Sequence, residues 1–438
     1  MSSALASRIV EEHAAAAARL PAGVVSPDRR RAAIEGLAAL GLPTARDENW
    51  KYANVRVLER ARFVPAPPPE RVRLEAGILP EPIGGYARYV FVDGVFAPEL
   101  SSPLERAGVS VRSLRTEPPE SQGAEPSSVP ADAADLRLAL LNEAFATDAV
   151  RVHVAFGTSC PMCLELVFVA SADAASGASY PRAEVCVEAG ARLGLIERHV
   201  GVGNGTSFVN AAVNVDIGRD AVVDHYRVQQ AGAADTWFDT LTCRVDASAV
   251  YRLYAVSLGA ASARSTVHVQ LAGERAEVGM YAASVADRRQ VHDTYALVDH
   301  IAPYARTSQR FRGIAAGRSR VAFNGKVVVR KNAKGADSDQ SLRGLLAGPE
   351  AEIDVRPQLE IYTDEVRCAH GATAGKLDDN MLFYLLSRGL DRATARHLLE
   401  WAFLEDVVAR IEVPELRRQI EQTLVGQMNE PTALKELL

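Results

Sequence analysis

Val187-Glu-Ala-Gly-Ala-Arg-Leu-Gly-Leu195 is the stretch that decides the fold, because its spacing returns along the chain. The pattern is an aliphatic residue, a glycine three positions later, and two apolar or small residues three and five positions after the glycine. It recurs at 215–223 and 345–353, where Gly218 and Gly348 are the anchors. Looser copies lie at 245–253, where Ser248 replaces the glycine, and around Gly273. The anchors at 190, 218, 248 and 273 are 28, 30 and 25 residues apart, and such a period is typical of solenoids.

Residues 150–365 are expected to form the β coils of this solenoid. Short β-branched and aromatic runs alternate there with Gly, Ala, Asn and Asp, without a long helical period. In a parallel β-helix each coil turns at a glycine and points small or branched side chains inward. A β-sandwich or jelly roll would also give many short strands at regular spacing. The repeat favours a mainly β fold with a parallel β-helix core, and the sandwich stays open as the alternative.

The N-terminal part is predicted to be largely helical. Residues 5–20 and 28–41 have helical composition, and a short helix near 135–147 leads into the β region. Segment 88–96 is predicted to form a hairpin around Asp93-Gly94, and the Pro- and Ser-rich residues 116–134 to form a linker.

The C-terminal part is predicted to contain three helices. The first covers 377–388 and ends at Gly389, Asp391 caps the second, and Pro414 opens the third. Helices at both termini would cover the ends of a solenoid, and they could equally dock a partner. The predicted regions are therefore 1–134, 135–370 and 371–438.

Composition excludes several classes of protein. The chain has 438 residues, of which 48% are hydrophobic and 24% charged, as in globular proteins. Its formal charge is −6 and no basic stripe stands out, so nucleic acid is not an expected partner. The longest apolar runs are too short to span a bilayer, and the first residues lack the hydrophobic core of a signal peptide. Five cysteines, an odd number, argue against a disulfide framework. We expect a cytoplasmic protein with reduced thiols.

Cys368-Ala369-His370 is the strongest candidate for a functional site. In an extended segment a Cys-x-His pair points both side chains to one face. Thiolate sulfur and imidazole nitrogen suit zinc, copper or iron, including iron–sulfur clusters. Two ligands are too few for a closed site of four, so other ligands would come from elsewhere in the chain or from a partner. The alternative to a metal site is a purely structural role, with a buried cysteine beside a histidine in a turn.

Other motifs are weaker. Cys160-Pro-Met-Cys163 can be a redox dithiol or half of a metal site, but ordinary turn and core residues explain it better. The histidines scattered through the β region are expected to be structural: His199, His225, His268, His292 and His300. No G-x-x-x-x-G-K-[ST] loop is present, so no nucleotide site of that kind is expected.

The C-terminal run Pro357–Gly375 and its continuation Leu377–Gly389 resemble the signature of the SufB/SufD family of iron–sulfur cluster assembly proteins. His370-Gly-Ala-Thr resembles the SufD branch, and Arg46-Asp-Glu-Asn-Trp-Lys-Tyr52 is also similar to that branch. The resemblance covers about residues 43–411. It implies a right-handed parallel β-helix between helical ends. Cys160 and Cys163 are not part of the family pattern.

The resemblance also implies a role and partners. The chain would be a non-catalytic scaffold that pairs with a SufB-like subunit through the β-helix and carries a SufC-like ATPase on residues 371–438. It would bind no nucleotide itself, and the isolated chain would be able to form a homodimer. His370 and Cys368 would be candidate ligands of a transient iron–sulfur cluster shared with the SufB-like partner, in a role that aids the admission of iron.

Two other functions stay open. A β-helix can be a carbohydrate-active enzyme, which would need paired acids and aromatic platforms, although only 6% of the residues are aromatic. Alternatively, Cys160 and Cys163 would make the chain a redox protein, and their thiols would then have depressed pKa values.

Overall fold

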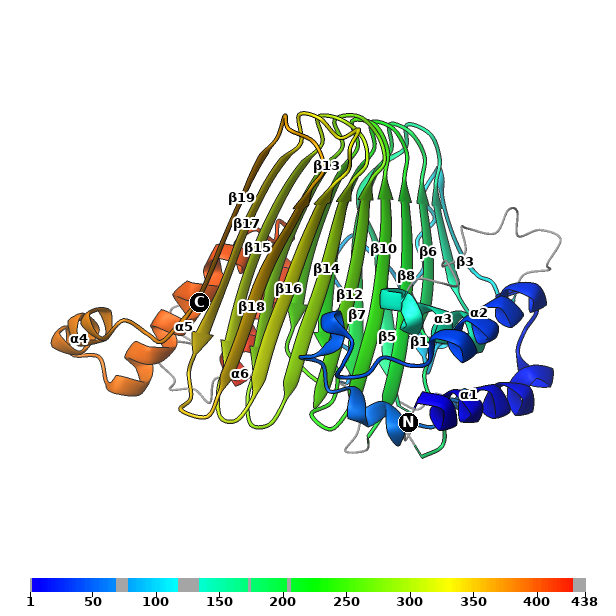
Figure 1. The fold of residues 1–438 in the computed structure, drawn as a ribbon, viewed down its shortest axis with the longest axis horizontal. Helices are drawn as coiled ribbons and strands as arrows, with labels where there is room; N and C mark the ends of the chain where they lie inside the picture. Colours follow the sequence, from blue (N-terminus) through cyan, green and yellow to red (C-terminus); the bar gives the residue numbers. More distant parts are fainter. Residues whose placement is uncertain (1, 68–77, 117–133, 172–174, 203–205, 428–438) are drawn as a thin grey trace.

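The protein is a two-sheet solenoid of parallel strands with helices at both termini (Figure 1). The computed structural model describes residues 2–67, 78–116, 134–171, 175–202 and 206–427. A ten-stranded sheet has the order β19-β17-β15-β13-β11-β9-β7-β5-β1-β2, and a nine-stranded sheet has the order β18-β16-β14-β12-β10-β8-β6-β4-β3. The predicted parallel β-helix core is confirmed, and the sandwich alternative is wrong.

The ten-stranded sheet contains β1 (Ala87–Val92), β2 (Val95–Phe96), β5 (Ser159–Ala170), β7 (Arg192–Gly201), β9 (Val222–Gln230), β11 (Val250–Ser257), β13 (Glu277–Ala286), β15 (Arg306–Ala315), β17 (Asp337–Leu346) and β19 (Arg367–Gly375). The nine-stranded sheet contains β3 (Val109–Ser113), β4 (Val150–Val154), β6 (Arg182–Val187), β8 (Phe208–Ile217), β10 (Thr236–Val245), β12 (Ser262–Leu271), β14 (Val291–His300), β16 (Arg320–Val329) and β18 (Glu352–Ile361). The chain alternates between the two sheets, so each coil adds one strand to each.

The length of a coil follows from the strand register. Aligned residues on successive strands of the ten-stranded sheet are Arg192, Val222, Val250, Glu277 and Arg306, which are 30, 28, 27 and 29 positions apart. In-register parallel strands place aligned side chains on the same face, so each inward position forms a row along the solenoid. Inward rows such as Leu193, Val223 and Tyr251 are buried, and each such side chain contributes about 1.5–3 kcal/mol of transfer free energy.

The predicted repeat is correct in period, and Ser248 is in register with Gly190, but Gly218 and Gly348 are not. Gly190, Asp220 and Ser248 are the left-handed residues of successive turns, with φ of 69°, 59° and 55°, so the residue equivalent to Gly190 is Asp220 and not Gly218. Gly348 lies at the other edge of the solenoid, in the turn from β17 to β18. The sequence pattern fits any turn that joins two strands. Each coil contains two such turns, one at each edge of the solenoid, so the pattern does not distinguish between them.

The N-terminal elements cover one end and one outer face of the solenoid (Figure 1). Helices α1 (Ser2–Ala16), α2 (Pro27–Leu40) and α3 (Arg137–Phe145) pack together, and α3 lies on β8 and β10. The predicted hairpin is confirmed, because β1 and β2 pair in antiparallel fashion around Asp93 and Gly94 with φ of 49° and 82°. Most of the predicted linker at 116–134 lies outside the described residues.

The C-terminal helices begin and end close to the predicted positions. They are α4 (Asp379–Ser387), α5 (Arg392–Val408) and α6 (Pro414–Gln427). Asp391 caps α5 by accepting hydrogen bonds from the backbone N–H groups of Ala393 and Thr394. The boundary expected at residue 370 falls within β19, which continues to Gly375. No helix within the described ranges is long and apolar enough to cross a membrane.

The expectation that helices cover both ends of the solenoid is wrong at the C-terminal end. Helices α5 and α6 pack against the outer face of the ten-stranded sheet, where Leu404, Leu416 and Leu424 contact an apolar cluster that includes Tyr226 and Tyr254. Helix α4 projects beyond the last coil (Figure 1). Nearly every side chain of β18 and β19 is therefore half-buried or exposed.

Candidate functional site

Cys368 and His370 lie on β19, the last strand of the ten-stranded sheet. Cys368 aligns with Ser338 and His370 with Gln340 on β17, and both of these β17 side chains are buried inside the solenoid. Because aligned residues of parallel strands face the same side, Cys368 and His370 both point toward the interior at its open end. The structure thus brings the two predicted site residues onto one face of one strand.

The two side chains differ in burial. His370 is exposed, whereas Cys368 is half-buried and packs against the core between the sheets. Burial, together with the nearby carboxylate of Asp337, raises the pKa of the Cys368 thiol above its ordinary value. The thiol is therefore neutral in the isolated chain at physiological pH, and a bound cation would be needed to favour the thiolate.

The open end of the solenoid surrounds this pair. Ile353, Val355 and Leu359 of β18 point inward and complete the last coil, but they are only half-buried. Beyond β18 and β19 no further strand pairs with either sheet in the described part of the chain. A Cβ atom on Gly371 would meet nothing within 4 Å. The last coil therefore presents apolar side chains, two free strand edges and the Cys368–His370 pair on one surface.

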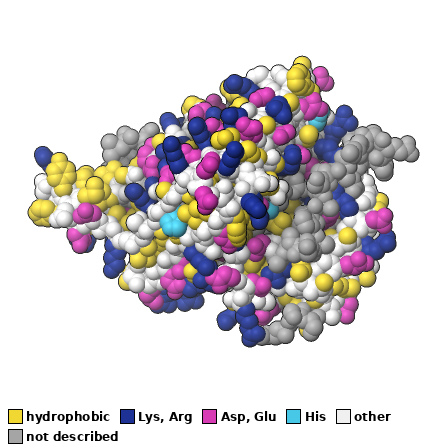
Figure 2. Space-filling model, turned by 45° about the horizontal axis from the view of Figure 1, so that its top comes forward, with side chains coloured by type: hydrophobic (Ala, Val, Ile, Leu, Met, Phe, Trp, Pro, Cys, Tyr) yellow, Lys and Arg dark blue, Asp and Glu magenta, His cyan; other side chains and the backbone are white. Residues whose placement is uncertain are grey.

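An apolar patch on α4 lies next to this end. Met381, Phe383 and Tyr384 are 57%, 72% and 56% exposed, while Leu382 is buried. Asp378 caps the helix by accepting hydrogen bonds from the backbone N–H groups of Asn380 and Met381, so the helix is well defined despite its exposure. Figure 2 shows hydrophobic side chains gathered at the end of the molecule where α4 projects. Exposed patches of this kind mark interaction sites.

A buried charged cluster inside the solenoid was not predicted. Glu197 accepts hydrogen bonds from Arg227 at 2.8 and 3.0 Å and contacts ring nitrogens of His199 and His225 at 2.5 and 3.0 Å. Arg227 also pairs with Asp239 at 2.7 Å. Although burial alone would raise the pKa of Glu197, Arg227 and the two histidines hold it well below its usual value. The signal in the sequence is Glu197-x-His199 followed one coil later by His225-x-Arg227, with all four at inward positions.

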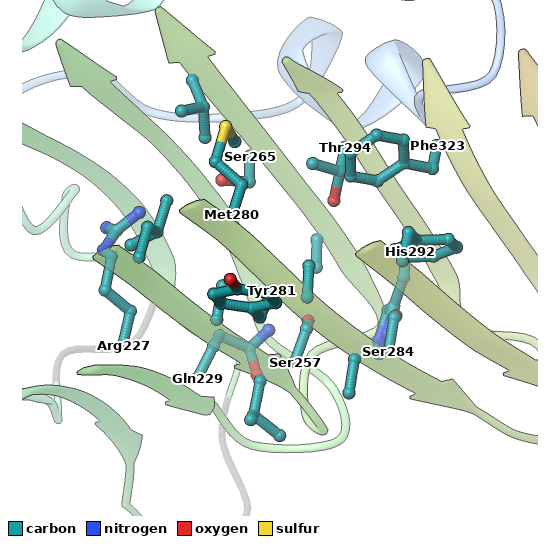
Figure 3. A pocket seen from close by; sticks show the side chains of 18 of the residues that line it. Arg227, Gln229, Ser257, Ser265, Met280, Tyr281, Ser284, His292, Thr294 and Phe323 are labelled. Atoms are coloured by element: carbon teal, nitrogen blue, oxygen red, sulfur yellow. The ribbon is translucent and has the colours of Figure 1, made fainter. Parts of the chain in front are cut away.

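Arg227 of this cluster lies at one end of an internal cavity in the middle coils (Figure 3), and His199 also lines that cavity. The cavity offers about 50 Å³ to the centres of water molecules, which is room for a few waters. Its lining includes Arg227, Ala255, Ser265, Ala282, Thr294 and Phe323. Its lining reaches Phe311 on β15, which only β17 separates from β19, and it does not include Cys368 or His370. Of the five histidines expected to be structural, His199, His225, His292 and His300 are buried between the sheets, whereas His268 is half-buried.

Cys160 and Cys163 are structural. Both are buried in the core between the sheets, and the strand register shifts between Cys160 and Leu164, so the motif forms a bulge in β5. Burial raises the pKa of Cys163 above its ordinary value, with Cys160 adding to the effect. A redox dithiol needs a depressed pKa, so this finding disagrees with the redox alternative.

The segment Arg46–Tyr52 is also structural in this chain. Trp50 is fully buried, and the guanidinium of Arg264 lies 4.1 Å from the centroid of its ring. Arg264 in turn pairs with Asp293 on the next strand. Glu48 pairs with Arg356 on β18, so the segment runs across the nine-stranded sheet as far as the last coil.

Comparisons with known proteins agree with this architecture. A family described as "SUF system FeS cluster assembly, SufBD core domain" matches residues 168–403, more than half of the chain. The iron–sulfur cluster assembly protein SufD of Escherichia coli is 28% identical over 88% of this chain and 89% of its own length. A SufBD family protein of Synechocystis is 28% identical over 90% and 89%, and the chloroplastic protein ABCI7 of Arabidopsis thaliana 31% over 57% and 53%. The match includes β19 with Cys368 and His370, and the chain belongs to the SufBD core family of the SUF iron–sulfur cluster assembly system.

Proposed function

We propose that this chain is a non-catalytic cytoplasmic scaffold subunit for iron–sulfur cluster assembly. It pairs with a SufB-like subunit through the last coil, and it carries a SufC-like ATPase on its C-terminal helices. The observation that supports this most strongly is the open last coil, which carries Cys368 and His370 at an uncovered end of the solenoid. Membership of the SufBD family supports the role in cluster assembly, while the partners and the ligands are our inference.

The last coil is suited to pair with a similar coil of another subunit. Its two edge strands have 10 and 9 residues, long enough to template further strand pairing. The half-buried Ile353, Val355 and Leu359 would become buried in such a contact and would stabilise it. Nothing inside this chain requires a glycine at 371, because a Cβ there meets open space. A close approach of the partner backbone would require one.

Cys368 and His370 supply two ligands to a nascent cluster, which is the cargo of the assembly and not a resident cofactor. A site of four needs further ligands, and the SufB-like partner supplies them across the pairing surface. The imidazole ligates only when neutral and the thiol only when deprotonated. His370 is the stronger candidate because it is exposed, whereas Cys368 must first lose a proton that its burial favours.

The exposed apolar patch of α4, formed by Met381, Phe383 and Tyr384, is the docking surface for the ATPase. ATP is hydrolysed by that partner and not by this chain. Helices α5 and α6 are firmly attached to the solenoid: Arg396 donates to the backbone oxygen of Ala347 at 2.9 Å, and the backbone N–H of Gly84 donates to Glu415 at 2.7 Å. Arg312 on β15 also pairs with Asp406. Movement of an ATPase bound to α4 would therefore be transmitted to the last coils, shear the pairing surface and admit iron and sulfide to His370.

The test is anaerobic co-expression of this chain with SufB-like and SufC-like subunits, followed by purification and an absorption spectrum after cluster reconstitution. His370→Ala should leave the complex intact and lower the cluster yield at least tenfold. His153→Ala, a surface histidine on β4 far from the last coil, is the matched control. Normal reconstitution by the His370 variant would sink the ligand assignment.

The two docking surfaces are tested separately in the same co-purification. Gly371→Val should lower recovery of the SufB-like subunit but not of the ATPase, and Phe383→Asp should do the opposite. If the isolated chain forms a homodimer, Gly371→Val should make it monomeric. Loss of both partners in either single variant would show that the two surfaces are not independent.

The other two functions are not supported. In a carbohydrate-active enzyme the paired acids must reach the substrate, but Glu197 and Asp239 are fully buried beside Arg227. The thiols of Cys160 and Cys163 lie in the core, and the pKa of Cys163 is raised and not depressed.

A further inference from the structure

The interior of the solenoid changes from apolar to polar in the two coils behind the Cys368–His370 pair. The row that ends at Cys368 runs Tyr251, Val278, Thr307, Ser338, Cys368. The row that ends at His370 runs Leu253, Met280, Gln309, Gln340, His370. Gln309 and Gln340 are each 1% exposed, although an aliphatic side chain would fill such a position without a desolvation cost. The packing of the interior therefore does not explain why glutamines occupy these two positions.

The two amides form a ladder along the solenoid axis. Nε2 of Gln340 donates to Oε1 of Gln309, one coil behind, at 3.2 Å. It also donates to the backbone oxygen of Gly325 on the facing sheet at 3.3 Å. A backbone carbonyl can only accept, so the contact with Gly325 fixes which end of the Gln340 amide carries the nitrogen. Only a glycine at position 325 leaves enough space for the Gln340 amide, because a Cβ there would lie 3.1 Å from Nε2 of Gln340.

The ladder has an unused acceptor at its forward end. Oε1 of Gln340 is buried and has no hydrogen-bond partner among the described residues. Nε2 is engaged by Gln309 and Gly325, so Oε1 is the atom of the amide that is left for a partner in the coil ahead, where His370 is the aligned residue on the same inward row. Neighbouring strands are about 4.8 Å apart, so an inward imidazole on β19 can reach this oxygen.

We infer that Gln340 is the positioning residue of the site, and that its Oε1 accepts a hydrogen bond from one ring N–H of His370. The inference rests on the proposed function of His370 as a cluster ligand. An imidazole that donates through one nitrogen is held in one tautomer and one orientation, with the lone pair of the other nitrogen free for a metal. The buried amides thus act on the exposed imidazole from inside the solenoid, where no partner subunit is needed.

The test reads the tautomer directly by NMR of the full chain labelled with ¹⁵N in the histidine rings. The chain has nine histidines, and the signal of His370 is identified by its loss in His370→Ala. At a pH where the ring is neutral, the wild-type chain should show the proton on one ring nitrogen of His370. Gln340→Met keeps the length of the side chain but removes the acceptor, so the two nitrogens should approach the averaged shifts of free imidazole.

Two variants control for structure. Gln340→Glu retains an acceptor and should keep the proton on the same nitrogen. Ser338→Ala changes the aligned residue beneath Cys368 and should leave the His370 signal unchanged. The inference is overturned if Gln340→Met leaves the tautomer of His370 as in the wild type, or if Gln340→Glu alters it as Gln340→Met does.

A second readout uses Co²⁺ alone as the probe. Removing an outer partner of a ligating histidine lowers metal affinity about 10–100-fold, so Gln340→Met should weaken Co²⁺ binding by that factor, toward the level of His370→Ala. Failure of the wild-type chain to bind Co²⁺ would count against the ligand assignment in the proposed function. The NMR readout would still decide the role of Gln340.

Discussion

His225 and His370 occupy the same inward row of the ten-stranded sheet, five coils apart, yet their surroundings are opposite. His225 is fully buried and bonded to Glu197 and to the hydroxyl of Tyr251 at 3.0 Å each. His370 is exposed at the end of the solenoid. The first imidazole has both nitrogens engaged within its own chain and is structural. The same residue type at the same position becomes available for binding only where the coils stop.

The same difference in burial separates the middle coils around His225 from the last coil around His370. In the middle coils the charges are sealed between two sheets, where Arg227 pairs with Glu197 and Asp239, so they cannot reach a ligand outside the solenoid. In the last coil the inward surface is half-open, so its side chains contribute less to stability and are accessible to a partner. Four measurements test this contrast between the two regions.

The largest effect is expected from Glu197→Ala in the sealed region. Removing this carboxylate leaves the His199 and His225 rings without their acceptor and Arg227 with one partner instead of two. Breaking a buried ion network typically costs about 3–5 kcal/mol of unfolding free energy. Urea unfolding of the full wild-type and variant chains measures this loss of unfolding free energy. A loss below about 1 kcal/mol would mean that the cluster is not a structural core.

Acid should destabilise the sealed region next most strongly. Burial lowers the pKa of His292 and of His300 to about 4, below the ordinary value of 6.5. Between these values the unfolded chain binds more protons than the folded chain, so stability falls as the pH drops from about 6.5 to 4, by roughly 3 kcal/mol per histidine at most. Unfolding free energies at pH 7 and pH 5 give the slope. The double variant His292→Gln/His300→Gln should flatten it, whereas His153→Gln, at the surface beside Glu188, should not.

At the open end, the apolar side chain of Leu359 should contribute to association with a partner and not to folding of the chain. Leu359→Asp places a charge on the half-buried inward surface of β18. We expect at least a tenfold loss of affinity for the SufB-like partner, which is about 1.4 kcal/mol, in a titration of the purified subunits. Arg192→Glu, exposed on β7, is the control for a charge change far from this end. Equal binding by both variants would place the pairing surface elsewhere.

The smallest effect on stability is expected from His370→Ala. The side chain is exposed, so the unfolding free energy should change by no more than about 0.5 kcal/mol. The matched change His225→Ala in the same row should cost several times more, because it leaves Glu197 and Tyr251 without a partner. Equal costs for the two variants would contradict the contrast between sealed and open coils.

The sequence was sufficient for the period of the coils, for the helical ends and for the placement of Cys368 and His370 on one face of a strand, because each is a local pattern. The charged cluster could not be assembled from local signals, since Glu197, Arg227 and Asp239 come from three different strands and meet only when the two sheets close. The open end was also missed. Periodicity shows that α5 has an apolar face, but not whether that face covers the end of the solenoid or, as observed, the outer side of β13 and β15.

The two ends of the solenoid also set a limit on polymerisation. At the N-terminal end the outermost strands are β2, with two residues, and β3, with five, and both run antiparallel to their neighbours. Such short edges do not template further strands. A molecule with two long free edges at one end and two short ones at the other can stack once, through its C-terminal end, but cannot continue head to tail. The pairing proposed for the last coil would therefore stop at two subunits and would not lead to a fibre.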